Sequence, residues 1–219
     1  MVTSKANMTF TPITQVITVD VKKALQDGVP SFRSFRSADP VLQQALLQAT
    51  QGLKVFTLGI PDVLSGGGGL QAAKLSGWRI AVADGGAAIA GDIYTMARGG
   101  KQPLPEGSPR LACIRQGQEV TNMLQTIADL SAPALAGQLP AEPFNVQLLI
   151  MPGLYTDALW LRPQNPGPTP SFIVPFHTLV DNVHLNYAYT EQDIIALLRP
   201  IAEKWMSYRP YLTSRATSI

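Results

Sequence analysis

The sequence predicts an α+β fold, in which a largely antiparallel sheet packs against about three helices and long loops rich in proline and glycine connect the elements. Two tight-turn signals, Asp84-Gly85-Gly86 and Pro152-Gly153, separate neighbouring apolar runs and favour antiparallel pairing. Helical spacing of apolar residues is confined to a few segments. We therefore expect a single domain over residues 1–219, with a flexible N-terminus (about 1–10) and C-terminal tail (about 207–219).

The N-terminal quarter predicts one strand and one helix. Residues 12–19 are rich in β-branched side chains and predict a first strand, and residues 32–36 are expected to be extended. Asp39 can cap a helix that has Pro40 at its first position, and Gly52 can end that helix in a left-handed conformation.

The middle of the chain predicts three strands. Residues 54–60 form one, and residues 78–83 and 87–96 form a hairpin around the Asp84–Gly86 turn. A loop with three glycines and three prolines is expected over residues 98–109, before a short apolar strand at residues 111–114.

The central feature of the sheet is a hairpin over residues 145–163, which contains two apolar runs on either side of Pro152-Gly153. Amphipathic helices over residues 118–130 and 191–206 are expected to cover it. Pro175 interrupts a strand over residues 171–176 and favours an edge position for that strand.

The composition limits the classes of function. Charged residues make up 15% of the chain, compared with about 25% in typical globular domains. A weakly charged surface favours a homo-oligomer or a protein partner, although a neutral soluble protein explains it equally well. The net charge of +2 argues against nucleic acid as a partner. Without a long apolar run or a signal-peptide pattern, we expect a soluble, cytoplasmic protein that does not bind membranes.

A glycine cluster gives the loosest match to a dinucleotide-binding fingerprint. The pattern Gly67-x-Gly69-x-x-Ala72 follows a predicted strand, and Asp84 ends the next one. The segment between these strands is too short for the crossover helix that such a site needs. We therefore interpret the cluster as a flexible loop and predict no cofactor.

Both histidines of the chain fall in one segment, with His177 and His184 on either side of Asp181. Two imidazoles and a carboxylate are common zinc or iron ligands. The segment lacks a clean helical pattern, so we favour a loop of hydrogen-bonding side chains and predict no metal, while these three residues remain candidate ligand-binding groups.

Two aspartates interrupt apolar strands. Asp92 and Asp157 need partners if they face inward, and they would form an acid/base or binding pair if both faced one cavity. The simpler interpretation of strand alternation is that both point to solvent.

Cys113, the single cysteine, excludes an intramolecular disulfide and a cysteine-rich zinc site. It could act as a nucleophile with His177 or His184 as the base. We favour a buried thiol in an apolar strand, because free cysteine is among the most buried residue types.

These patterns assign no catalytic residue. The leading hypothesis is a non-enzymatic self-assembly or protein-interaction domain. The alternative is a small-molecule-binding protein or enzyme with a pocket on the sheet, in which Asp157, Asp92 or the histidine segment supplies the polar groups.

Overall fold

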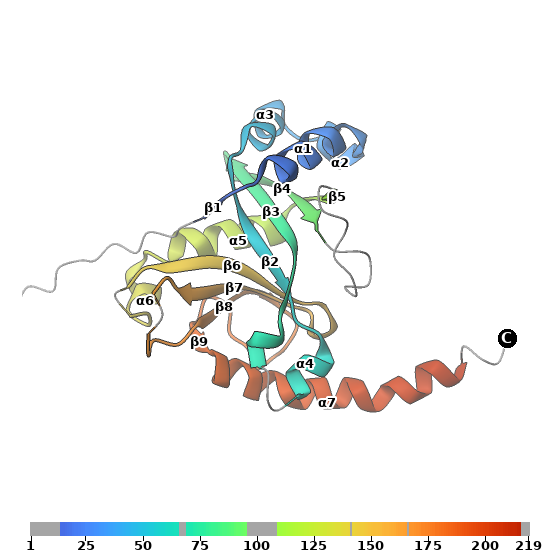
Figure 1. Cartoon of the computed structure of the whole chain (residues 1–219), viewed down its shortest axis with the longest axis vertical. Coiled ribbons are helices and arrows are strands. Elements are labelled where there is room, and N and C mark those ends of the chain that lie inside the picture. The colour runs from blue at the N-terminus through green and yellow to red at the C-terminus, as the bar shows by residue number, and fades with distance from the viewer. Residues whose placement is uncertain (1–13, 66–68, 96–108, 141, 166, 216–219) are drawn as a thin grey trace, which may run out of the picture.

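The fold is α+β, as the sequence predicts, and one sheet contains all nine of the described strands (Figure 1). The computed structural model describes residues 14–65, 69–95, 109–140, 142–165 and 167–215. The predicted flexible N-terminus therefore lies outside the described residues, as does most of the predicted loop at 98–109 and the glycine pattern's Gly67.

Strands alternate with helices along the chain. The strands are β1 (Gln15–Val16), β2 (Gln51–Thr57), β3 (Lys74–Asp84), β4 (Ala87–Tyr94), β5 (Arg110–Gln116), β6 (Phe144–Met151), β7 (Thr156–Pro163), β8 (Phe172–Thr178) and β9 (Tyr189–Thr190). The α-helices are α1 (Val19–Gly28), α2 (Arg33–Arg36), α3 (Pro40–Gln48), α4 (Ile60–Leu64), α5 (Gln118–Asp129), α6 (Pro133–Ala136) and α7 (Glu191–Arg215). Short 3₁₀ turns are η1 (Val29–Ser31), η2 (Gly69–Ala72) and η3 (Pro152–Leu154).

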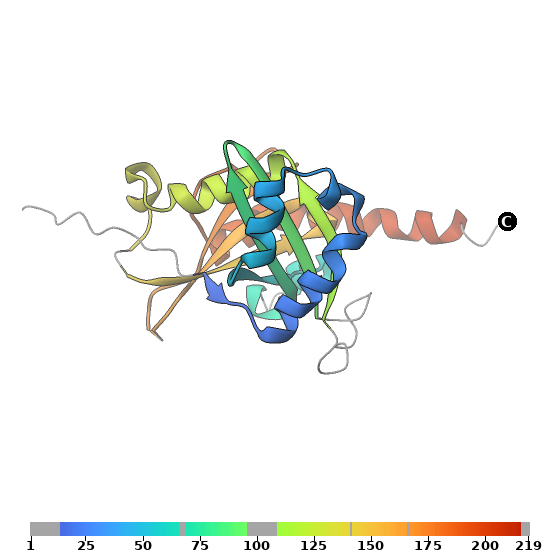
Figure 2. The same ribbon diagram turned by 90° about the horizontal axis from the view of Figure 1, so that it is seen from above.

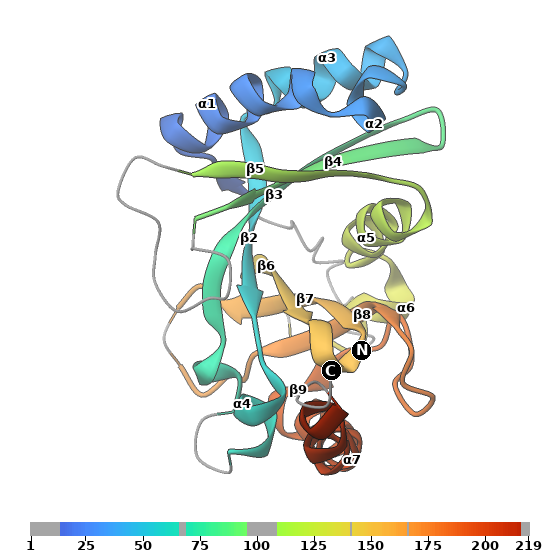
Figure 3. The same ribbon diagram turned by 90° about the vertical axis from the view of Figure 1, so that its right-hand side faces the viewer.

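The sheet bends back over itself around β2 (Figure 3). Its strand order is β5-β4-β3-β2-β6-β7-β8-β9, with β1 paired to β2. Strand β2 pairs antiparallel with β3 and parallel with β6, whereas every other described pair is antiparallel. As a result, the layer β3–β4–β5 lies over the layer β6–β7–β8.

Strand alternation divides the apolar side chains among three cores. Helices α1, α2 and α3 cover the outer face of β3–β4–β5 (Figure 2). Helix α5 contributes to the core between the two layers, and α7 with α4 covers the outer face of β6–β7–β8. The inner core includes Leu53, Val55, Ala90, Val120, Met123, Val146, Leu148, Leu159, Leu161, Val174 and Phe176.

The N-terminal elements correct two predictions. The strand expected over residues 12–19 is reduced to β1, because Thr18 caps α1 by accepting a hydrogen bond from the Val21 backbone N–H. Residues 32–36 are not extended, since α2 forms there and buries Phe35. Asp39 caps α3 as expected, but that helix ends at Gln48, well before Gly52, which lies in β2.

The predicted central hairpin is confirmed as β6 and β7, paired from Phe144–Pro163 to Met151–Thr156. Tyr155 follows η3 in the left-handed region at φ 48° and directly precedes β7. Strand β9 pairs only with Phe172 and Ile173 of β8. The part of β8 that contains Pro175 therefore pairs with β7 but not with β9, which partly agrees with the predicted edge position. None of the helices in the described ranges is long and apolar enough to cross a membrane.

Candidate functional site

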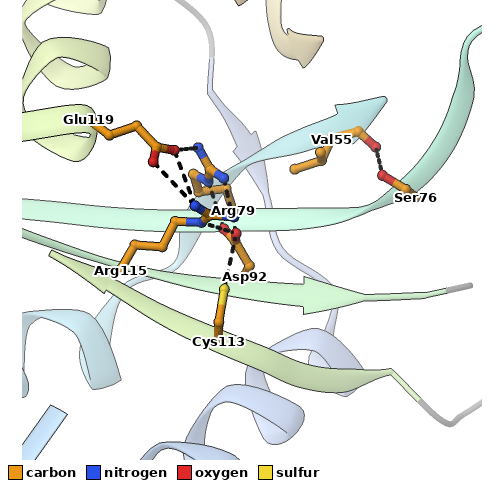
Figure 4. A network of polar contacts seen from close by, with 7 residues as sticks. All are labelled: Val55, Ser76, Arg79, Asp92, Cys113, Arg115 and Glu119. Carbon is orange, nitrogen blue, oxygen red and sulfur yellow. Dashed lines mark hydrogen bonds and ion pairs between the residues drawn. The ribbon is translucent and has the colours of Figure 1, made fainter. Parts of the chain in front are cut away.

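Four charged side chains form a connected network between the two layers (Figure 4). Arg79 on β3 forms a bidentate pair with Asp92 on β4, with distances of 2.6 Å from Nε to Oδ1 and 3.0 Å from Nη2 to Oδ2. Arg115 on β5 donates from Nε to Asp92 Oδ2 at 2.6 Å. Glu119 on α5 accepts from Arg115 Nη1 at 3.2 Å and from Arg79 Nη1 at 3.4 Å. Asp92 thus joins two guanidinium groups, and Glu119 closes the network from the helix.

Local sequence explains why these groups meet. Arg79 and Asp92 are direct cross-strand partners, and alternation places both on the inner face of their layer. Gly117, at φ 92°, turns the chain from β5 into α5, so that Arg115 and Glu119 lie four residues apart across the turn. The network is therefore built by strand register and one glycine turn.

The network keeps its members charged. Burial alone would raise the pKa of Asp92, but the hydrogen bonds and positive charges of Arg79 and Arg115 outweigh it and hold that pKa below its usual value. Burial alone would likewise lower the pKa of Arg79, and the bond to Asp92 reverses that effect. The expectation that Asp92 points to solvent is wrong, since this residue is only 3% exposed. An inward Asp92 keeps its charge because two guanidinium groups surround it.

Cys113 lies beside the network, where its Sγ donates to Asp92 Oδ2 at 3.5 Å. Burial, followed by the negative charge of Asp92, raises the pKa of this thiol to about 11. The thiol is therefore protonated near neutral pH, which argues against its role as a nucleophile. It is half-buried in β5, so the prediction of a buried thiol is only partly met.

Asp157 and His177 face the same region from the opposite layer. They are cross-strand partners on β7 and β8, where the register shifts by one residue. Burial is the main reason that the pKa of Asp157 is raised, and Glu119 adds to this effect, while Arg79, His177 and Arg115 oppose it. The charges of three network residues therefore act on the Asp157 carboxylate. Within the described ranges, no hydrogen bond or ion pair reaches its carboxylate.

The other candidate groups do not join this cluster. Asp181 lines a separate pocket beside α7, and His184 is exposed, with its backbone N–H donating to Tyr189 Oη at 2.9 Å. Among the residues that the structure describes, no group of three His, Cys, Asp or Glu side chains is arranged to hold a metal ion. The histidine segment is therefore divided among β8, the α7 pocket and an exposed loop.

The α7 pocket was not predicted from the sequence. It has a volume of about 440 Å³ and lies between the turn before β7, the loop after β8 and the middle of α7. Its lining residues are Leu154, Tyr155, Leu179, Val180, Asp181, Ile201, Lys204, Trp205 and Tyr208. The available signal was a helix that carries Trp205 and Tyr208 three residues apart, beyond its buried part.

No protein-family model, curated protein or solved structure matches this chain.

Proposed function

We propose that this chain is a non-enzymatic domain that assembles with copies of itself through α7. The observation that carries the proposal is the extension of α7 beyond the rest of the molecule (Figures 1 and 2). At a rise of about 1.5 Å per residue, the 25 residues of α7 span roughly 37 Å. Among the residues of α7 whose side chains are described, 191–208, the buried ones are Ile194, Leu198 and Ala202, in the N-terminal half of the helix.

The exposed apolar side chains support the same surface. Trp205 and Tyr208 on α7 are 43% and 51% exposed, and the neighbouring Tyr155 and Leu179 are also exposed. Aromatic residues are enriched in protein interfaces because they bury a large area with few rotatable bonds. The charged network argues against catalysis at that place, since Asp92, Arg79 and their partners engage one another.

The proposal predicts self-association that depends on Trp205. In sedimentation velocity at concentrations from 1 to 100 µM, we expect a species larger than the monomer, and Trp205→Glu should raise its dissociation constant about thirtyfold, since an aromatic hot spot contributes roughly 2 kcal/mol. Val19→Glu is a matched control, because Val19 is exposed at the start of α1, away from α7. A wild-type chain that stays monomeric at 100 µM would contradict the proposal, and would leave another protein as the partner.

A second candidate function is small-molecule binding between the layers, with Asp157 as the anchoring group and His177 beside it. The observation that favours it is a partly buried carboxylate whose pKa is raised and which no other described side chain engages. Such groups occur at binding and catalytic sites, where they are retained at a cost to stability.

This second candidate predicts that Asp157→Asn stabilises the fold at pH 7. Because the pKa of Asp157 is higher in the folded chain, ionising it costs free energy above that pKa and costs nothing below the unfolded value of 3.8. The gain in melting temperature should therefore shrink as the pH falls toward 3.8. Asp27→Asn serves as the control, because Asp27 is exposed near the end of α1. A destabilised Asp157→Asn variant would show that this carboxylate supports the fold instead.

A further inference from the structure

The pocket beside α7 combines aromatic walls with two charges. Tyr155, Trp205 and Tyr208 all line it and all remain about half exposed. The rings of Tyr155 and Trp205 lie side by side at the pocket, with their centroids 6.3 Å apart and their planes inclined by 50°. Its volume of about 440 Å³ falls in the range of small-molecule sites, about 300–1,000 Å³.

Aromatic faces of this kind attract organic cations. The π electrons make the face of each ring negative, so an alkylammonium group within about 6 Å of a ring centroid is stabilised. The fold already contains two such contacts, Arg162 over Trp160 at 4.9 Å and Lys54 over Trp78 at 5.7 Å. In the α7 pocket, Asp181 adds a carboxylate to the aromatic walls.

Tyr155 has a backbone conformation that is unfavourable for a tyrosine. Its φ of 48° lies in the left-handed region, which is unfavourable for a residue that carries a Cβ and a large side chain. Its carbonyl oxygen accepts from the Leu179 backbone N–H at 3.2 Å, which ties the turn to the opposite wall of the pocket. Since Tyr155 is 52% exposed, core packing does not explain why a tyrosine occupies this position.

The two charges of the pocket select the type of ligand. Asp181 and Lys204 both line it, and neither forms an ion pair with any residue in the described part of the chain. A ligand with a positive charge alone would be repelled by Lys204, and one with a negative charge alone by Asp181. A ligand that carries both charges complements both side chains.

We propose that this pocket binds a small, free zwitterion. Its alkylated ammonium group lies against Tyr155 and Trp205 near Asp181, and its carboxylate or phosphate faces Lys204. This role goes beyond the assembly proposed for α7. Because Tyr155, Trp205 and Tyr208 belong both to the pocket and to the proposed assembly surface, ligand binding and self-association should compete, and binding is measured at a concentration at which sedimentation shows the monomer.

Glycine betaine is the probe, because it joins a trimethylammonium group to a carboxylate. Binding to the full chain is measured by NMR titration, following the indole N–H signal that disappears in Trp205→Phe. 3,3-Dimethylbutanoate has the same shape and carboxylate but a neutral carbon in place of the nitrogen, and should bind about tenfold more weakly, the effect expected for loss of a cation–π contact. Tetramethylammonium, which lacks the anion, should also bind more weakly than betaine.

Three variants assign the parts of the pocket. Tyr155→Gly should retain the stability of the fold, because glycine accepts the positive φ, and yet weaken betaine binding about tenfold. Asp181→Asn should weaken betaine and tetramethylammonium alike. Lys204→Gln should weaken betaine while leaving tetramethylammonium unchanged or bound more tightly. Tyr187→Ala is the control, because Tyr187 is an exposed aromatic residue that does not line the pocket.

Three results would overturn the proposal. One is the absence of betaine binding at 50 mM. Another is equal affinity for betaine and 3,3-dimethylbutanoate, which would make the pocket merely apolar. The third is a betaine affinity that Tyr155→Gly leaves unchanged while its fold is intact. Because the titration is made on the monomer, a failure of the wild-type chain to self-associate would leave these three outcomes unaffected.

Discussion

Asp92→Ala is expected to lower the free energy of unfolding by about 3–5 kcal/mol, the cost of removing one partner from a buried ion pair. The Arg79 side chain is 0% exposed and would lose its bidentate carboxylate, leaving a buried guanidinium with only the longer contact to Glu119. Urea denaturation measures the change. Asp84→Ala provides the control at the exposed end of β3, where we expect a change within about 0.5 kcal/mol.

The double variant Arg79→Met/Asp92→Leu separates the net contribution of the ion pair to the free energy of unfolding from the cost of leaving one partner buried alone. Replacing both charges with apolar side chains of similar size is often neutral or stabilising, so this variant should recover most of the loss. A cost below about 1 kcal/mol for Asp92→Ala alone would mean that water reaches the network.

Acid should act on the same pair. The pKa of Asp92 is lower in the folded chain than its ordinary value of 3.8, so its stabilising contribution is complete above that pH. The contribution is lost as the pH falls through the folded pKa. Asp92→Ala should therefore unfold with a weaker dependence on pH below 3.8 than the wild-type chain.

Gly77→Ala is expected to destabilise the fold by about 3 kcal/mol, the upper part of the usual range for overpacking. A Cβ at this position would lie 2.0 Å from the carbonyl oxygen of Ile93 and 3.1 Å from the Cα of Tyr94, both in the backbone of β4. Because backbone atoms cannot rotate away, the pairing of β3 with β4 must open at this point. Thermal and urea unfolding measure the loss.

Gly91→Ala, on the partner strand, is the matched control. Its added Cβ would approach the Leu25 Cδ1 at 2.7 Å, which is the end of a flexible side chain. We expect a cost of about 1 kcal/mol, since Leu25 can change rotamer. Similar losses for the two variants would show that the β3–β4 backbone yields as easily as a side chain does.

Much of the sheet could be predicted because its turns and periodicity are local. The hairpin β3–β4 follows from Asp84-Gly85-Gly86, and the hairpin β6–β7 from two apolar runs around Pro152-Gly153. The Asp39 cap of α3 could also be predicted from the sequence, since a capping side chain bonds to a backbone N–H two or three residues away. Each of these features is determined by residues that are close to it in the sequence.

The missed features depend on contacts between distant parts of the chain. The parallel pairing of β2 with β6 joins Val55 to Leu148, and no turn signal announces such a pair. The ion-pair network depends on the register between β3, β4 and β5 and on the position where α5 starts. The sequence does not give these registers, so it could not decide whether Asp92 points inward or to solvent. Similarly, three segments of the chain form the α7 pocket. Asp181 is the one residue of its lining that the sequence suggested as a ligand-binding group.

The contact between α4 and α7 has a consequence for synthesis on the ribosome. Leu58, Val63 and Leu70 belong to the core that Ile194, Leu198 and Ala202 complete, and the Glu191 carboxylate accepts a hydrogen bond from the Leu70 backbone N–H. The nascent chain must therefore carry these apolar side chains without their α7 partners until residues 194–202 have emerged. At about 5–20 residues per second, that interval lasts roughly 6–25 s, during which the unfinished chain is open to aggregation or to chaperones.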